Sequence, residues 1–140
     1  MKKIIFIFSL ILISSCSTVE TNEIDTEVLD KTIRIEISTL EANDAVQISY
    51  YDYVTDSDNF SQYIFEYDSS GKAIPVVITL EDYDFRYIRG EVYRKNSIPT
   101  QLSLRIYVDD ELIIDESETG DGSKWVNIGF NYDIAKMTNI

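Results

Sequence analysis

Few residues in this chain could carry out nucleophilic, acid–base or metal chemistry. Its 140 residues include no histidine and a single cysteine, Cys16. Without histidine, Ser-His-Asp and Cys-His sites cannot be assembled, and the commonest metal ligand is missing. One cysteine forms neither an internal disulfide nor a thiolate zinc site. The 25 acidic residues leave a glycosidase-type carboxylate pair as an option. They fall mostly on loops and strand faces, where solvation is the default, so we expect no enzyme.

Two acidic segments have some of the oxygen ligands that calcium requires. Residues 56–59 begin like a calcium loop, but Phe60 stands where an oxygen ligand should follow and Ser61 replaces the glycine of the sharp turn. Residues 115–123 offer Asp115, Glu118 and Asp121 as ligands in a glycine-containing segment. Both segments are more typical of solvated turns, so we predict no metal site and no cofactor.

Cys16 stands where an apolar run gives way to small and polar residues. Lys2 and Lys3 precede residues 4–13, which are apolar except for Ser9. Ten residues of helix rise about 15 Å, which is half of the hydrocarbon core and too short to cross it. A short cationic start followed by such a run is typical of a secretory signal peptide.

The motif Ile13-Ser14-Ser15-Cys16 resembles the lipobox of bacterial lipoproteins. The resemblance implies that residues 1–15 are a signal peptide removed before Cys16. It also implies that the Cys16 sulfur carries a diacylglycerol and that the new amine carries a further acyl chain such as palmitate. Two acyl chains contribute on the order of 20 kcal/mol of anchoring free energy. Ser17, rather than Asp, follows the cysteine, which points to the outer membrane, with the domain on its periplasmic or its surface face.

Residues 16–31 are expected to be the lipidated N-terminus and an acidic linker. Residues 17–30 contain five acids and no cation, and like charges favour an extended chain. Fully extended, they reach about 46 Å. Without Lys2 and Lys3 the mature chain has 10 cations against 25 acids, a net charge of −15. Such a chain repels phosphate backbones and anionic lipids, so nucleic acid is excluded as a partner and the membrane is held through the lipid alone.

Residues 32–134 show apolar side chains at every second position, the pattern of half-buried β-strands. The clearest alternation is at Leu102, Leu104, Ile106 and Val108. About seven or eight such strands, separated by polar turns, predict an all-β fold: an antiparallel, immunoglobulin-like β-sandwich, with a small barrel as the alternative. Asp109-Asp110 lies between two alternating runs, as a two-residue hairpin turn would. Residues 135–140 are expected to be a C-terminal tail.

Residues 104–132 are similar to the C-terminal hairpin and last strand of the MmpS-like family of envelope proteins. In that family a strand ends in Val-Asp-Gly and is followed by a charged residue, an aliphatic strand, a polar loop and a closing strand. More loosely, the overlay extends over residues 44–134. It implies a small, exported, immunoglobulin-like sandwich, which in one branch is an accessory to lipid or siderophore exporters. Here Asp110 replaces the turn glycine, and a lipid replaces that branch's transmembrane helix.

The ten tyrosines and one tryptophan are many for this length. Tyrosine combines an apolar ring with a polar tip. Most of these rings are expected to be half-buried strand residues. Tyr51 and Tyr53 are the candidates for an exposed ligand or partner surface.

We therefore expect a lipid-anchored envelope protein whose sandwich is a non-enzymatic interaction or transport-accessory module, with an envelope protein as partner. The alternative is a surface lipoprotein that binds glycans or small ligands through exposed tyrosines.

Overall fold

The chain folds into antiparallel β-sheets, as predicted. The computed structural model describes residues 30–40, 45–53, 55–94, 99–123 and 125–140. Its strands are β1 (Lys31–Thr39), β2 (Ala45–Asp52), β3 (Ser57–Ile64), β4 (Glu66–Tyr67), β5 (Ala73–Ile74), β6 (Val76–Tyr83), β7 (Tyr87–Arg94), β8 (Gln101–Val108), β9 (Glu111–Thr119), β10 (Val126–Asp133) and β11 (Thr138–Asn139). Among the described residues, no helix is long and apolar enough to cross a membrane.

The described residues form 11 strands, rather than the predicted seven or eight. Eight of them have eight or nine residues, whereas β4, β5 and β11 have two each. A two-residue strand contains no alternation that could be recognised in a sequence. The long strands contain the alternating runs that the periodicity predicted, but two of them extend further. β3 begins at Ser57 and β9 continues to Thr119, so residues 57–59 and 115–119, which were expected to lie in solvated turns, belong to strands. The short strands depend on pairing with a neighbour.

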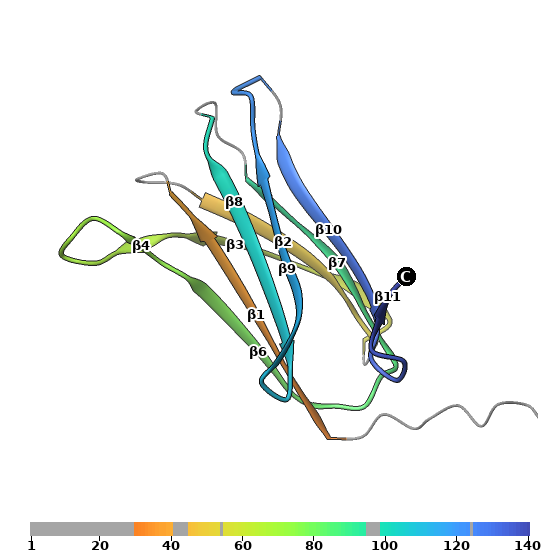
Figure 1. Cartoon of the computed structure of the whole chain (residues 1–140). Coiled ribbons are helices and arrows are strands. Elements are labelled where there is room, and N and C mark those ends of the chain that lie inside the picture. Colours follow the sequence, from red (N-terminus) through yellow and green to blue (C-terminus); the bar gives the residue numbers. More distant parts are fainter. Residues whose placement is uncertain (1–29, 41–44, 54, 95–98, 124) are drawn as a thin grey trace, which may run out of the picture.

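Two sheets face each other as a sandwich (Figure 1). The first has the strand order β6-β1-β8-β9, and the second has the order β11-β10-β7-β2-β3. A separate two-stranded sheet, β4-β5, lies in the connection between β3 and β6. The chain changes sheet between most successive long strands. It stays within one sheet at the hairpins β2-β3 and β8-β9 and at the pairs β4-β5 and β10-β11. Sandwiches of the immunoglobulin type share this two-sheet architecture without always sharing its connectivity.

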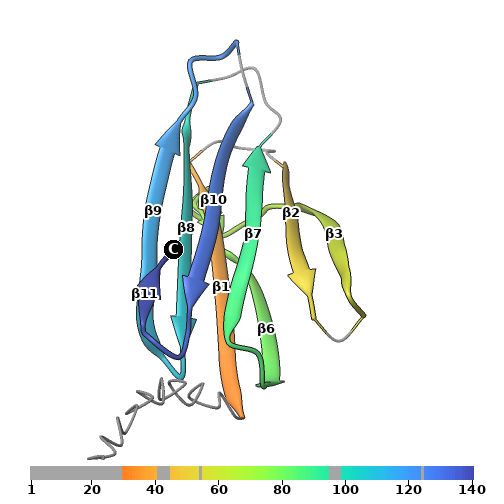
Figure 2. The same cartoon turned by 90° about the vertical axis from the view of Figure 1, so that its right-hand side faces the viewer.

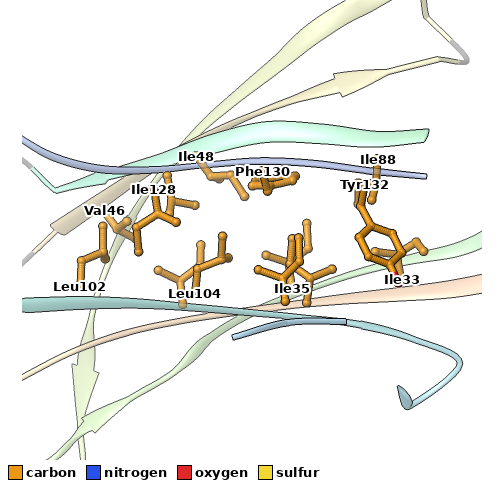
Figure 3. Packing of buried hydrophobic residues seen from close by; sticks show 14 of the residues in the cluster. Ile33, Ile35, Val46, Ile48, Ile88, Leu102, Leu104, Ile128, Phe130 and Tyr132 are labelled. Carbon is orange, nitrogen blue, oxygen red and sulfur yellow. The ribbon is translucent and has the colours of Figure 1, made fainter. Parts of the chain in front are cut away.

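The core lies between the sheets and is built from the alternating apolar residues (Figure 3). Ile33, Ile35 and Ile37 of β1 are fully buried, as is the β8 pair Leu102 and Leu104. The facing sheet contributes the buried members of β2, β7 and β10: Val46, Ile48, Ile88, Val92, Val126, Ile128, Phe130 and Tyr132. Burying side chains of this size contributes about 1.5–3 kcal/mol each before the entropy of folding is counted.

The predicted two-residue turn between β8 and β9 is confirmed. Asp109 and Asp110 connect the two strands with φ values of 48° and 66°, and positive φ at both central positions is the mark of a type I′ hairpin turn. The turn is also joined to β1, because the Asp109 carboxylate accepts a hydrogen bond from the Thr32 amide at 3.0 Å. The start of β1, the end of β6 and this turn lie at one end of the sandwich (Figure 1), called the β1 end below.

Candidate functional site

The two predicted surface tyrosines lie at the β1 end, whereas Cys16 lies outside the described residues. Tyr51 is the next-to-last residue of β2, and Tyr53 follows directly after that strand. Both side chains are half-buried. The reason is found in two aromatic residues that are distant in sequence, Tyr83 at the end of β6 and Phe85 in the β6-β7 connection.

These four rings, called the aromatic cluster, contact one another in a chain. Tyr51 meets Tyr53 edge-on, with centroids 4.7 Å apart and planes at 77°. Tyr53 stacks on Phe85 at 5.0 Å and 20°, and Tyr83 meets Phe85 edge-on at 5.6 Å and 72°. Edge-on and stacked pairs contribute about 0.5–1.5 kcal/mol each beyond their area. Tyr51 and Tyr53 therefore do not form the pair of coplanar rings on which a sugar would stack.

Polar contacts hold Tyr51 in place. The guanidinium of Arg89 lies 4.2 Å from the centroid of its ring, a cation–π contact. The Tyr51 hydroxyl donates a hydrogen bond to the Asp56 carboxylate, and this bond raises the pKa of Tyr51. Asp56 adopts a positive φ of 51° in the turn that leads into β3, a conformation that Asp tolerates better than most residues.

A pocket of about 300 Å³ opens beside the aromatic cluster, between the end of β2 and the end of β6. It is lined by Tyr50, Tyr51, Asp52, Leu80, Glu81, Asp82, Tyr83 and Phe85. Aromatic and aliphatic carbon forms part of the wall, and three of these eight residues have carboxylates. None of the eight is cationic. The pocket is called the acidic pocket below.

The buried tyrosines of the acidic pocket stay neutral near physiological pH. Burial raises the pKa of Tyr83, and the neighbouring Tyr53 and the Asp52 carboxylate raise it further. Burial likewise raises the pKa of Tyr50, with contributions from Tyr63 and Asp52. The Tyr83 hydroxyl already donates a hydrogen bond of 2.6 Å to the backbone carbonyl of Tyr87. The Tyr83 hydroxyl is therefore engaged with the backbone of the pocket wall.

The acidic pocket adjoins the point where the described chain begins. Tyr83 pairs with Lys31 across the β1-β6 ladder, and the Asp30 amide donates a hydrogen bond of 2.8 Å to the Asp84 carboxylate. The chain therefore enters the sandwich beside the pocket. In the part of the chain that the structure describes, no group of three or more acidic or other ligand side chains is placed to hold a metal ion.

The sequence predicted a residue in one wall of the acidic pocket but none in the other wall. Tyr51 was singled out, but Leu80, Glu81, Asp82 and Phe85 were not. The first three belong to β6 of the opposite sheet and Phe85 to the connection that follows it. No local pattern shows that the end of β6 lies beside the end of β2. The dense run of acids and aromatics at residues 81–87 is the signal that could have marked this segment.

The chain was also compared with known proteins. No model of a known protein family matches it, and a comparison with curated proteins finds no significant match. Its function is therefore inferred from its own residues and their geometry.

Proposed function

We propose that this chain is a lipid-anchored protein of the bacterial envelope whose β-sandwich is a non-enzymatic binding module. The lipid is attached at Cys16 and holds the protein at the outer membrane. Residues 17–30 separate the anchor from the sandwich, which binds another component of the envelope. The transport-accessory role of the MmpS-like branch is one form that such binding takes.

The observation that carries the binding function is the acidic pocket. Pockets for small ligands have volumes of about 300–1,000 Å³, with apolar walls and a few converging polar groups. The acidic pocket has this composition at the lower end of that range. Its tyrosines act as wall and support rather than as bases, because burial raises the pKa of both Tyr50 and Tyr83.

The position of the acidic pocket suits a tethered protein. Lys31, where β1 begins, pairs with Tyr83 of the pocket wall, so the pocket lies on the side from which the linker arrives. A fully extended linker of 14 residues reaches about 46 Å. The negative charge of the sandwich opposes close contact with an anionic bilayer. The pocket therefore remains within reach of components near the membrane surface without being pressed against it.

Metabolic labelling with a fatty acid tests the anchor. We expect wild-type protein to take up the label and Cys16→Ala to take up none and to accumulate as the longer precursor. Ser17→Ala is the matched control and should still be labelled, because it keeps the thiol and the cleavage site. A Cys16→Ala protein that still carried label would refute the lipid anchor.

Co-purification from detergent-solubilised membranes tests the binding module. We expect a partner or ligand to be retained by the wild-type protein and lost when the pocket is filled, as in Leu80→Trp. Val77→Trp, at an exposed position on the same strand, is the control, and this variant should still retain the partner or ligand. Retention that does not differ between the two variants would contradict the assignment of binding to this pocket.

A glycan-binding function is the second candidate, and it is favoured by the outer face of the five-stranded sheet. Across this face the strand register places Gln62, Gln47, Tyr93 and Asn127 in one row. Trp125 lies against Tyr93 at 6.1 Å and is half exposed. Amides can bond paired hydroxyls, and exposed rings can stack on a sugar. Because Trp125 is the one tryptophan of the chain, a change in its fluorescence on adding cell-envelope polysaccharide would report binding, and an unchanged spectrum would contradict it.

A further inference from the structure

One edge of β10 is only partly covered by β11. The two strands pair at Tyr132 and Asp133, and the Ile140 amide donates a hydrogen bond of 2.9 Å to the Asn131 carbonyl. Among the described residues, no strand pairs with this edge at residues 126–130, although β7 pairs with the other edge along the whole of β10. Figure 2 shows β11 beside the lower part of β10 alone. The second sheet therefore has an open edge five residues long.

The bond from Ile140 shows which backbone groups of this open edge point outward. In an antiparallel pair, the amide and the carbonyl of one residue point to the same neighbouring strand, and those of the next residue point to the other side. Because the Asn131 carbonyl points to β11, the amides and carbonyls of Asn127 and Gly129 point to that side too. These two residues present two donors and two acceptors to any strand that continues the line of β11.

The open edge lies in a groove between β10 and β9, called the β10 groove below. Its volume is about 290 Å³, and it is lined by Ile114, Glu116, Glu118, Asn127, Ile128, Gly129, Phe130, Asn131, Asn139 and Ile140. The three residues of β9 pair with buried residues of β8, so they lie on the core-facing side of their strand. None of the ten lining residues is cationic. The groove thus combines an open backbone edge with two glutamates.

We infer that the β10 groove binds an extended segment of a partner protein that has basic side chains at alternate positions. In strand addition to an open sheet edge, main-chain hydrogen bonds provide affinity and alternate side chains provide specificity. Glu116 and Glu118 are two residues apart in a strand, about 7 Å, and alternate side chains of an extended segment have the same spacing. This inference goes beyond the acidic pocket, which adjoins β6 at the opposite edge of the first sheet.

Charge favours a different protein over a second copy of this chain. The chain has a net charge of −13. The edge strands of its two main sheets, β3, β6, β9 and β11, contain no cation. An edge strand of a copy would place only neutral or acidic side chains against Glu116 and Glu118, and like charges at an interface oppose association. A basic segment is complementary to both glutamates.

Calorimetric titration of the detergent-solubilised full chain with a synthetic peptide tests the inference. Since β9 and β10 run in opposite directions (Figure 2), a peptide antiparallel to β10 passes Ile114, Glu116 and Glu118 in that order. The blocked peptide Val-Thr-Arg-Thr-Arg presents an apolar and two basic side chains to them. We expect it to bind, with an affinity that falls as salt is added. Val-Thr-Glu-Thr-Glu should bind at least about tenfold more weakly, and equal binding of both peptides, or of neither, would overturn the inference.

N-methylated peptides separate strand addition from simple charge attraction. In the antiparallel register the two threonine amides face Asn127 and Gly129, so methylating both should weaken binding at least about tenfold. The arginine amides face away from β10, and methylating them should change the affinity by less than about threefold. Equal effects of the two modifications would show that no ladder forms, and the reverse pattern would overturn the antiparallel register.

Amide hydrogen exchange locates the bound peptide. Exchange at the amides of Asn127 and Gly129 should become slower when the peptide binds, because these amides gain partners. The amides of Ile128 and Phe130 face β7 and should change little. Binding without slower exchange at Asn127 and Gly129 would place the peptide elsewhere and refute the site.

Charge variants with a matched control complete the test. Glu116→Gln with Glu118→Gln should weaken binding of the arginine peptide about three- to tenfold. The control, Glu81→Gln with Asp82→Asn, removes the same charge from β6 and should bind it within about twofold of wild type. Asn is chosen at position 82 because the backbone there has a φ of 51°, which Asn tolerates. Equal losses in the two variants would reduce the effect to net charge and refute the site.

Light scattering after size-exclusion chromatography identifies a second copy as the occupant. We expect the mass of the protein to be independent of its concentration and unchanged by the arginine peptide, apart from the mass of the peptide itself. A mass that rose with concentration and fell when the peptide was added would show that another copy fills the β10 groove, and would overturn the assignment to a basic partner.

Discussion

Gly90 of β7 lies at a position where the packing of the second sheet leaves no room for a side chain. It pairs with Phe130 across β7 and β10, and the Phe130 ring lies over it. A Cβ atom at this position would lie 2.3 Å from the Ser49 carbonyl oxygen and 2.6 Å from Phe130 Cζ. Real Cβ atoms do not approach other atoms so closely, and one of the two is backbone.

Gly90→Ala should therefore lower the free energy of unfolding by about 1–3 kcal/mol, the usual range for overpacking a core. Gly129→Ala is the matched control on the neighbouring strand, because a Cβ there would meet nothing closer than 4.0 Å. It should be neutral or slightly stabilising. Urea unfolding measures the free energy of unfolding of both variants. Equal effects of the two substitutions would contradict the steric explanation.

Asp133 is a buried carboxylate fixed by Arg86. The guanidinium donates to it from Nε at 3.0 Å and from Nη2 at 2.9 Å, and the Lys136 amide donates to it at 3.1 Å. The hydrogen bonds from Arg86 hold the pKa of Asp133 below its usual value. A carboxyl whose pKa is lower when folded stabilises the protein above its unfolded pKa, and this contribution is lost as the pH falls through the folded pKa.

Asp133→Asn should lower the free energy of unfolding near neutral pH by about 2 kcal/mol. The difference in the free energy of unfolding between this variant and the wild type should become smaller as the pH falls below about 4. Asp115→Asn, which breaks the half-exposed pair with Arg105, is the control and should change stability by less than about 1 kcal/mol. An Asp133→Asn deficit that remained constant down to strongly acid pH would show that the carboxylate charge is not its cause.

At the scale of the elements, β9 is an edge strand protected by charge. Its register places Glu116 opposite Leu104 and Glu118 opposite Leu102. Directly paired residues lie on the same face of a sheet, so the two glutamates are on the core-facing side. Inward-pointing charges at an exposed edge prevent sheets of two molecules from joining.

Replacing both Glu116 and Glu118 with Val should make the protein self-associate, because β9 would then offer a flat apolar edge. Light scattering after size-exclusion chromatography measures the mass. The control is the double variant Glu116→Gln and Glu118→Gln, which removes charge without adding apolar surface. Its measured mass should stay closer to that of the wild type. A Val variant with an unchanged mass would show that the edge is protected by other means.

At the scale of the whole molecule, the sandwich brings the acidic pocket and the beginning of the chain together. Figure 2 shows β6, at the edge of the first sheet, on the same side of the sandwich as β2 and β3 of the second. The ends of β2 and β6 meet across the open side of the sandwich, and Tyr83 pairs there with Lys31. The pocket therefore lies beside the residue at which the described chain begins.

The alternation of apolar residues in the sequence predicted most of the long strands, the buried faces of β1 and β8, and the β8-β9 turn. These features depend on a period of two residues and on turn residues that are neighbours in the chain. The sequence also identified Cys16 and its surroundings as a lipidation motif, and that remains a prediction outside the described residues.

Which strands are neighbours, and therefore where the pocket lies, could be learned only from the folded domain. Tyr51 was a candidate from sequence as an exposed ring, but the fold places it against Tyr53 and beneath Arg89. Glu81 and Asp82 of β6, in the other sheet, and Phe85 of the β6-β7 connection complete the pocket. Alternation tells which face of a strand is buried, but not which strand lies opposite, because any apolar face can cover any other. The packing of the whole domain determines which strands lie opposite each other.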